Sequence, residues 1–286
     1  MTSDLAQRIR NVYASFSKGQ KKLANAVLNN YEKIAGMTAA RLGRYVGVSE
    51  STVVRFAGVL GFDGYAEFQA AVEDLLRKKL TLNQRIDATK KRIYRRDIIE
   101  NVMKADIQRI RTTMENLDKK IFSDSVDAIM QAKNIYVIGA RGSEPIAKML
   151  QYNLSLIFDN VKFIVPSSTA EVFEQMYSID KNDALIAFCY PRYSSKVVNA
   201  VKYASDNGAN VILFTDTEAS PPAEYASLLL LSQVDFASFM DSLVSPLCII
   251  NALIIEITNR RESEIRARFD KLESVWDEYG VYTKGR

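Results

Sequence analysis

Five short apolar runs alternate with helical segments between residues 135 and 232, and no other feature limits the fold as strongly. The runs are IYVIG (135–139), VKFIV (161–165), ALIAF (184–188), NVILFT (210–215) and SLLLLS (227–232). Helices are expected between them, near 143–158, 169–178, 194–207 and 220–226. Strands that are apolar throughout are buried on both faces, as in a parallel sheet covered by helices. The pattern predicts an α/β domain with a five-stranded, doubly wound parallel sheet of the flavodoxin-like type.

Helical periodicity predicts the elements that flank the sheet. Helices are expected at 97–117 and 118–132 before it, and at 238–259 and 263–280 after it. The apolar run 243–257 is too short to cross a bilayer and is interrupted by Pro246 and Asn251, so it is expected to be a buried helix. The final helix has an apolar face that should pack on its own domain or on a partner subunit, made of Ile265, Phe269, Leu272 and Trp276.

Residues 1–76 are expected to form a separate all-helical domain. Within it, Thr38 and Ser49 are candidate caps for two short helices, and Gly47 lies where the turn between them needs a residue without a Cβ. Ala39, Leu42, Val53 and Phe56 would face the core. This spacing is typical of a helix-turn-helix, although two merely packed helices would fit it as well.

The second of these helices would then expose the side chains that can read DNA. Small hydroxyl groups and one arginine near a helix N-terminus suit the major groove. These candidates are Ser49, Glu50, Ser51, Thr52 and Arg55.

The charge distribution supports a polyanionic partner for the first part of the chain only. Residues 1–120 hold 23 Lys and Arg against 13 Asp and Glu, while the remaining residues hold 15 against 21. The segment 77–96 is the most basic, with nine Lys and Arg against one Asp, and is expected to be a linker to a second domain at 97–286. An uneven solvated surface would give the same counts, so charge alone leaves both interpretations open.

Several classes of function are disfavoured by composition. The two cysteines, Cys189 and Cys248, have neither disulfide nor metal-ligand spacing, so neither a metal nor another cofactor is expected. The start MTSDLAQRIR lacks the apolar stretch of a secretory signal, and no run is long enough for a membrane helix. A cytoplasmic protein without membrane contact is expected.

The turn after the first strand resembles a phosphate-binding loop but not a dinucleotide site. A dinucleotide fingerprint needs three spaced glycines and an acidic residue after the second strand. Here the turn Gly139-Ala-Arg-Gly142-Ser-Glu-Pro misses two of the three glycines, and the second strand ends in IVPSS without an acid.

The chain resembles the RpiR (MurR/RpiR) family of bacterial transcription regulators. The resemblance rests on KLANAVLNNYEKIAGMTAARLGRYVGVSESTVVRF and LGFDGYAEFQ in residues 1–76, and residues 97–260 resemble that family's sugar isomerase (SIS) domain. It implies a homodimer or homotetramer that binds operator DNA and whose SIS domain binds an effector, commonly a phosphorylated sugar. A basic residue is usual between VVRF and LGF, but Ala57, Gly58 and Val59 stand there. Contacts to DNA phosphates are therefore expected to depend more on Arg41, Arg44 and the linker.

The phosphate loops of a SIS domain are only partly kept. The G-x-G-x-S turn corresponds to 139–143, and the hydroxyl-rich loop S-x-S-G-x-T corresponds to 189–194, where only Ser194 keeps its type. Arginines have appeared instead, one after the first strand and one after the third, which are neighbours in a doubly wound sheet. They could hold a carboxylate or phosphate through a bidentate pair, or they could point to solvent. The candidate effector-binding residues are Arg141, Gly142, Ser143, Ser168, Arg192, Tyr193, Ser194 and Ser195.

No catalytic residue is predicted. Isomerases of this fold move a proton with a Glu or His base, but the chain contains no histidine, and Glu144 stands where the helix dipole alone favours an acid. The sequence therefore predicts a transcription regulator, not an enzyme, that senses an anionic metabolite such as a sugar phosphate or sugar acid. The alternatives are a sugar-phosphate isomerase with a helical appendage and a redox sensor that uses Cys189.

Overall fold

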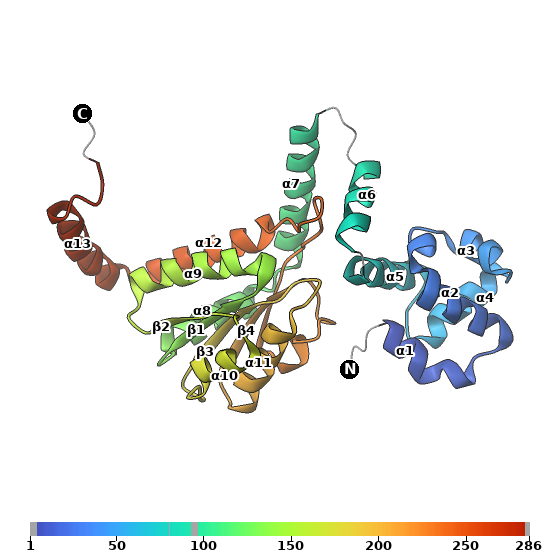
Figure 1. Ribbon diagram of the computed structural model, residues 1–286, viewed down its shortest axis with the longest axis horizontal. Coiled ribbons are helices and arrows are strands. Elements are labelled where there is room, and N and C mark those ends of the chain that lie inside the picture. The colour runs from blue at the N-terminus through green and yellow to red at the C-terminus, as the bar shows by residue number, and fades with distance from the viewer. Residues whose placement is uncertain (1–4, 80, 93–96, 284–286) are drawn as a thin grey trace. The chain divides into compact units, whose positions relative to one another are not determined.

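The protein, described here by a computed structural model, consists of two compact units. Residues 5–79, 81–92 and 97–283 are described. One unit comprises residues 1–88 and the other residues 89–286 (Figure 1). The division falls inside the segment expected to be a linker. Most of the described part of that segment is helical, at the end of α5 and in α6, and its residues 93–96 lie outside the described residues.

The first unit is built from short helices around one aromatic core. Its elements are α1 (Leu5–Val12), the 3₁₀ turn η1 (Tyr13–Ser15), α2 (Lys18–Ile34), α3 (Ala39–Val46), α4 (Glu50–Val59), α5 (Tyr65–Lys79) and α6 (Leu82–Arg92). The rings of Phe16 and Phe68 both contact Phe56, with centroids 5.2 and 5.7 Å away. Phe56 is fully buried, so the second helix of the pair is anchored on the body of the domain, as expected.

Backbone constraints at two glycines fix the turn between α3 and α4. Gly47 ends α3 in the left-handed conformation, with φ +74°, which an L side chain rarely adopts. A Cβ on Gly43 would lie 2.8 Å from the carbonyl oxygen of Val48, so only glycine lets the turn approach α3 this closely. Thr38 and Ser49 cap the two helices as predicted, each accepting a backbone N–H three residues on.

The second unit contains the predicted parallel sheet. Its strands are β1 (Ile135–Gly139), β2 (Val161–Ile164), β3 (Ala184–Phe188), β4 (Asn210–Thr215) and β5 (Leu228–Leu231), in the order β2-β1-β3-β4-β5. All the neighbouring strands are parallel, and β1 and β3 lie side by side with Gly139 opposite Phe188. The strand order reverses at β1, which places the usual ligand crevice at the carboxyl ends of β1 and β3.

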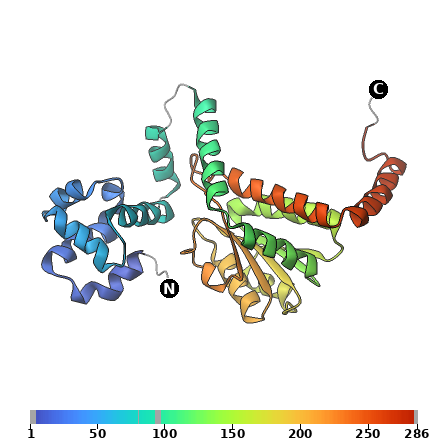
Figure 2. The same cartoon turned by 180° about the vertical axis from the view of Figure 1, so that it is seen from behind.

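Helices cover both faces of this sheet (Figure 2). One face packs against α8 (Lys119–Gln131), α9 (Glu144–Ile157) and α12 (Val244–Arg260). The other packs against α10 (Thr169–Met176) and α11 (Ser195–Asp206). The unit is completed by α7 (Ile98–Asn116), which packs on α12, by the 3₁₀ turns η2 (Arg141–Ser143) and η3 (Ala223–Tyr225), and by α13 (Glu262–Glu278).

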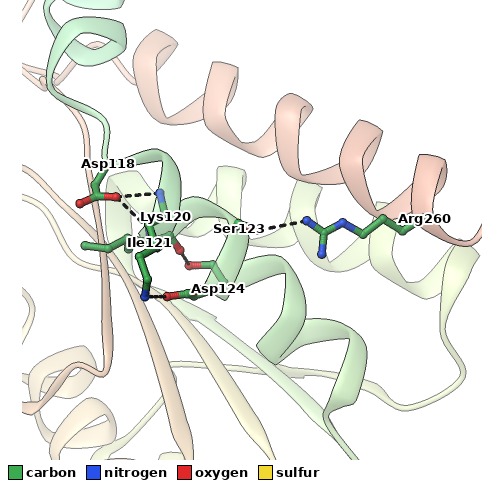
Figure 3. Close-up of polar contacts among 7 residues, drawn as sticks. Asp118, Lys120, Ile121, Ser123, Asp124 and Arg260 are labelled. Carbon is green, nitrogen blue, oxygen red and sulfur yellow. Dashed lines mark hydrogen bonds and ion pairs between the residues drawn. The ribbon is translucent and has the colours of Figure 1, made fainter.

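Polar side chains hold α8 in place under α12. The Asp118 carboxylate accepts the backbone N–H groups of Lys120 and Ile121, at 2.7 and 3.1 Å, and so caps α8. Lys120 pairs with Asp124 along the helix, and the Arg260 guanidinium reaches from α12 to Ser123, at 3.1 Å (Figure 3). Arg260 also pairs with Asp127, at 2.7 Å, so the two helices are joined at two points.

Two of the expected helices differ from the structure, and the first helix of the chain is short. The helix expected at 238–259 begins at Val244, because Pro246 lacks an N–H and is tolerated only in a first turn. The helix expected at 220–226 is a single 3₁₀ turn after two prolines. The first helix of the chain ends at Val12 and continues as the 3₁₀ turn. None of the helices in the described residues is long and apolar enough to cross a membrane.

Candidate functional site

The candidate DNA-reading residues all lie on one exposed side of α4 or at its start. Ser49, Glu50, Ser51 and Arg55 are exposed, whereas Thr52 is half-buried, because its methyl group lies against Gly19 of α2. Arg41 and Arg44 are exposed on α3. The structure thus brings these residues to the surface of one helix pair. Thr52 is less exposed than expected.

Part of this surface is already engaged in local hydrogen bonds. The Ser49 hydroxyl accepts the Thr52 backbone N–H and lies 3.0 Å from the Ser51 hydroxyl and 2.8 Å from the Thr52 hydroxyl. Arg55 donates through Nε to the carbonyl oxygen of Ser51, at 3.2 Å, which leaves the two terminal nitrogens of its fork for other acceptors. Ser49 therefore orders the helix start, and Arg55 is the side chain best placed to donate to a base.

The second candidate site lies where β1 and β3 end. The strands are paired up to Gly139 and Phe188, so the turn 140–143 and the loop 189–194 leave the sheet next to each other. Each leads directly into a helix N-terminus, that of α9 or that of α11. Exposed backbone N–H groups and the helix dipole make such ends favourable for anions.

Four serines in this region differ in their surroundings and in the hydrogen bonds of their hydroxyls. Ser143 and Ser194 stand at the N-caps of α9 and α11, yet neither side chain makes a capping hydrogen bond. Ser168 caps α10 by accepting the Glu171 N–H at 3.2 Å, so its hydroxyl already has a structural role. Ser195 is exposed in the first turn of α11. Ser143 is buried and Ser194 is half-buried, so their hydroxyls are less accessible than that of Ser195.

Both arginines of this region are exposed, and neither has a polar partner within the described part of the chain. Arg141 has φ +55°, a left-handed conformation that is uncommon for a residue other than glycine. Such outliers gather at functional sites, where the surrounding structure holds them in place. Gly142 beside it has no heavy atom within 4 Å of its would-be Cβ, so the backbone here is open to an approaching group.

The β3–α11 loop is held by side chains on both sides of it. The Tyr193 hydroxyl donates to Asp216 at 2.9 Å, and the Thr215 hydroxyl donates to the carbonyl oxygen of Cys189 at 2.9 Å. Within the loop, the buried Tyr190 hydroxyl lies 2.5 Å from that of Ser232. The Tyr193 hydroxyl is thus turned to the end of β4 and helps to fix the loop, while effector contact by this residue stays a prediction.

Sequence reasoning did not single out Lys196. Its ammonium group donates to the carbonyl oxygens of Pro166, at 2.8 Å, and Ser167, and so ties the first turn of α11 to the β2–α10 loop. No carboxylate among the described residues pairs with this charge, and both of its acceptors are neutral carbonyl oxygens. The sequence feature that could have pointed to Lys196 is its position in the first turn of a helix, where the helix dipole disfavours a cation.

Cys189 is almost completely buried at the start of the loop. Burial raises the pKa of its thiol to about 12, although the Ser194 backbone N–H acts in the opposite direction. Because the thiolate is the reactive form, such a thiol is unreactive at neutral pH. The burial of Cys189 and its raised pKa argue against the role of a redox sensor.

The structure also bears on catalysis and metal binding. The Glu144 carboxylate, the acid nearest the first turn, is paired with Lys148 at 2.6 Å along α9. Among the described residues no three His, Cys, Asp or Glu side chains gather as a metal site would require. The arginine and serine side chains at the ends of β1 and β3 are hydrogen-bond donors of the kind that bind anions.

Two protein families match this chain in sequence. The helix-turn-helix domain of the rpiR family matches residues 3–79, and the SIS domain matches residues 128–256. The first range contains α3 and α4, and the second contains the whole parallel sheet with the candidate crevice.

Relatives in other bacteria match over most of their length. An uncharacterized HTH-type transcriptional regulator of Haemophilus influenzae is 25% identical over 81% of this chain and 80% of its own. The HTH-type transcriptional regulator HexR of Pseudomonas aeruginosa is 24% identical over 94% of both chains. The same order of domains is therefore shared along nearly the whole chain.

A solved structure shows the same fold. The NanR protein of Vibrio vulnificus, complexed with ManNAc-6P, aligns over 98% of this chain and 100% of its own, with a TM-score of 0.61 and 20% identity. The matched families, the order of the two domains and the relatives agree with each other. The chain belongs to the RpiR family of transcription regulators, with an rpiR-type helix-turn-helix domain followed by a SIS domain.

Proposed function

We propose that this regulator binds operator DNA through α4 and responds to a small anionic effector held at the carboxyl ends of β1 and β3. The effector is a sugar phosphate or a sugar acid, and the protein acts as a homodimer or homotetramer. The similar Vibrio protein is complexed with a sugar phosphate, which supports this class of ligand.

The observation that carries the proposal is the set of unused donors at the two strand ends. The Ser143 and Ser194 hydroxyls cap nothing, and the guanidinium groups of Arg141 and Arg192 have no partner among the described residues. Structural serines and surface arginines usually find a neighbour, as Ser168 and Arg260 do. Four uncommitted donors at two adjacent helix N-termini suit an anion with several oxygen atoms.

The same residues fit a protein that binds the effector without isomerising it. Sugar isomerisation needs a base within hydrogen-bond reach of the proton that it removes. Glu144 is committed to Lys148, and the groups that converge here are cations and hydroxyls. The proposed role is therefore sensing and not turnover.

Two measurements test the proposal. Competition binding with wild type and Arg55→Ala should show that the variant loses preference for operator over random duplex by about 1–3 kcal/mol, the value of one base-reading side chain. Calorimetric titration of sugar phosphates and sugar acids should find a ligand that changes operator affinity. That ligand should bind poorly to Arg192→Ala and less well to Arg192→Lys, since an ammonium cannot form the two-pronged contact.

Arg266→Ala is the matched control, because Arg266 is an exposed arginine of the same unit that pairs only with Glu262, on α13. It should leave effector affinity unchanged. If Arg192→Ala binds the effector as well as wild type does, the site lies elsewhere. If Arg55→Ala keeps operator preference, α4 is not the reading helix.

A further inference from the structure

Val54 is an exposed apolar side chain among the candidate DNA-reading residues of α4. It lies between Ser51 and Arg55 along the helix, and 44% of it is exposed. A single exposed apolar residue is common at a protein surface. Among the described residues, however, Val54 belongs neither to the core of the first unit nor to the side chains packed against it. A β-branched residue also loses rotamer freedom in a helix, so neither packing nor helix formation explains a valine here.

The exposed face of α4 is shaped so that its backbone can come close to another surface. Since a helix turns by about 100° per residue, the outermost line opposite the buried side passes through Ser51 and Gly58. A Cβ at Gly58 would have no heavy atom within 4 Å. Val54 and Arg55 stand on the two sides of this line. The small outermost residues therefore let α4 approach the floor of a groove, with Val54 and Arg55 reaching to either side.

The chemistry of valine restricts what this side chain can recognise in a major groove. Valine has no donor and no acceptor, so it cannot make the hydrogen bonds that distinguish most base edges. The C5 methyl group of thymine is the apolar feature that a base presents there. A β-branched side chain in a helix holds essentially one rotamer, so the two methyl groups of Val54 are already oriented before DNA arrives.

We propose that Val54 reads the C5 methyl group of a thymine in the bound DNA. The inference rests on the proposed function, because it takes α4 as the helix that enters the major groove. It adds a second kind of base contact to that of Arg55, whose two terminal nitrogens suit a guanine. The preferred sequence should therefore contain a guanine and a thymine in each half-site, and the thymine should be distinguished by its methyl group.

The test uses a duplex that the full-length protein itself selects from a library of random sequences. Each thymine of this duplex is replaced in turn by deoxyuridine, which differs from it only by lacking the C5 methyl group. Fluorescence anisotropy at constant salt should show wild type binding about fourfold more weakly when one particular thymine of a half-site is replaced, the effect of losing one buried methyl group. Val54→Ala should bind the unmodified duplex more weakly and should no longer distinguish thymine from deoxyuridine at that position.

Val59→Ala is the matched control for this measurement. Val59 is the same residue type on the same helix and is 47% exposed. It is the last residue of α4, however, whereas the N-terminal part of a recognition helix contacts the base edges. Val59→Ala should keep the wild-type difference between thymine and deoxyuridine. Alanine is a better helix former than valine, so neither substitution should unfold α4.

Three results would overturn the proposal. They are equal binding of thymine and deoxyuridine duplexes by wild type, a Val54→Ala variant that still distinguishes them, and a loss of the difference in Val59→Ala in place of Val54→Ala. Each of them leaves α4 as the reading helix to be judged by the operator preference of Arg55→Ala. A library from which the protein selects no sequence would instead contradict the proposed function and the thymine contact together.

Discussion

At the scale of single residues, the two glycines of the first turn have different reasons to be there. A Cβ on Gly139 would lie 2.7 Å from both the Ala147 Cβ and the Ser143 carbonyl oxygen, so this glycine lets α9 pack on β1. Gly142 has open space instead, and its backbone is not left-handed. Gly139 is thus needed for packing of the fold, whereas Gly142 leaves open space beside the candidate crevice.

The expected result is that Gly139→Ala destabilises the SIS unit by about 1–3 kcal/mol, as overpacking in a close contact does. Gly142→Ala should leave stability nearly unchanged but weaken effector binding, because its methyl group would occupy the approach to the backbone. Denaturant unfolding and ligand titration of both variants measure the two effects. Equal stability of the two variants would show that α9 shifts freely.

The two thiols should also behave differently. Cys248 is exposed, whereas burial raises the pKa of Cys189 to about 12, so that at pH 8 its thiol stays protonated and unreactive. Thiol counting in the native protein should find one reactive cysteine, and peptide mapping should place the label on Cys248. Labelling of Cys189 at a similar rate would restore the redox alternative.

At the scale of elements, two serines stand at helix N-caps, but only one of them makes a capping hydrogen bond with its side chain. Ser49 caps α4 through its hydroxyl, and Ser194 begins α11 without capping it. Ser49→Ala should therefore lower the stability of the helix-turn-helix unit by about 1 kcal/mol. Ser194→Ala should leave the unfolding of the SIS unit almost unchanged while it weakens effector binding.

The stabilities of the two units need separate readouts, because a chain with two compact units is not required to unfold in one step. Hydrogen exchange followed peptide by peptide distinguishes α4 from α11. A loss of protection in α11 on Ser194→Ala would assign that serine a capping role and remove it from the effector site.

Strand positions could be predicted closely because a polar residue stands at or just before the start of each apolar run, and the five strands differ from expectation by at most one residue at either end. The start of α12 could not be found from periodicity, since the apolar run around Pro246 has no clear phase. Most of the charged segment 77–96 is helical because long charged side chains are good helix formers even without an apolar face.

The candidate crevice was predictable in its place but not in its details. Strand order follows from the alternation of strands and helices, and it brings the loops of Arg141 and Arg192 together. That Ser168 caps a helix, that Tyr193 turns to Asp216 and that Lys196 crosses to Pro166 depends on loop conformation. Spacing along the chain does not encode these directions.

At the scale of the whole molecule, the charge asymmetry predicts how DNA binding responds to salt. The first 120 residues hold ten more basic than acidic side chains, and the rest hold six more acidic ones. A protein that neutralises several phosphates releases their counterions, so operator affinity should fall by about 10³-fold or more between 50 and 200 mM salt. Fluorescence anisotropy over this range measures the slope, and Arg44→Ala should reduce it by about one unit. A flat salt profile would contradict phosphate contacts by the basic unit.

The anchored β3–α11 loop has a consequence for the rates at which a ligand would bind and leave. Because Tyr190, Tyr193 and Cys189 are each tied to the neighbouring strand ends, this wall of the crevice is already shaped before a ligand arrives. Encounter with a preformed wall needs no slow loop closure, so arrival is governed by diffusion and the lifetime of the complex by dissociation. If the effector binds here as proposed, its occupancy of the site should follow the metabolite concentration without delay from a loop rearrangement.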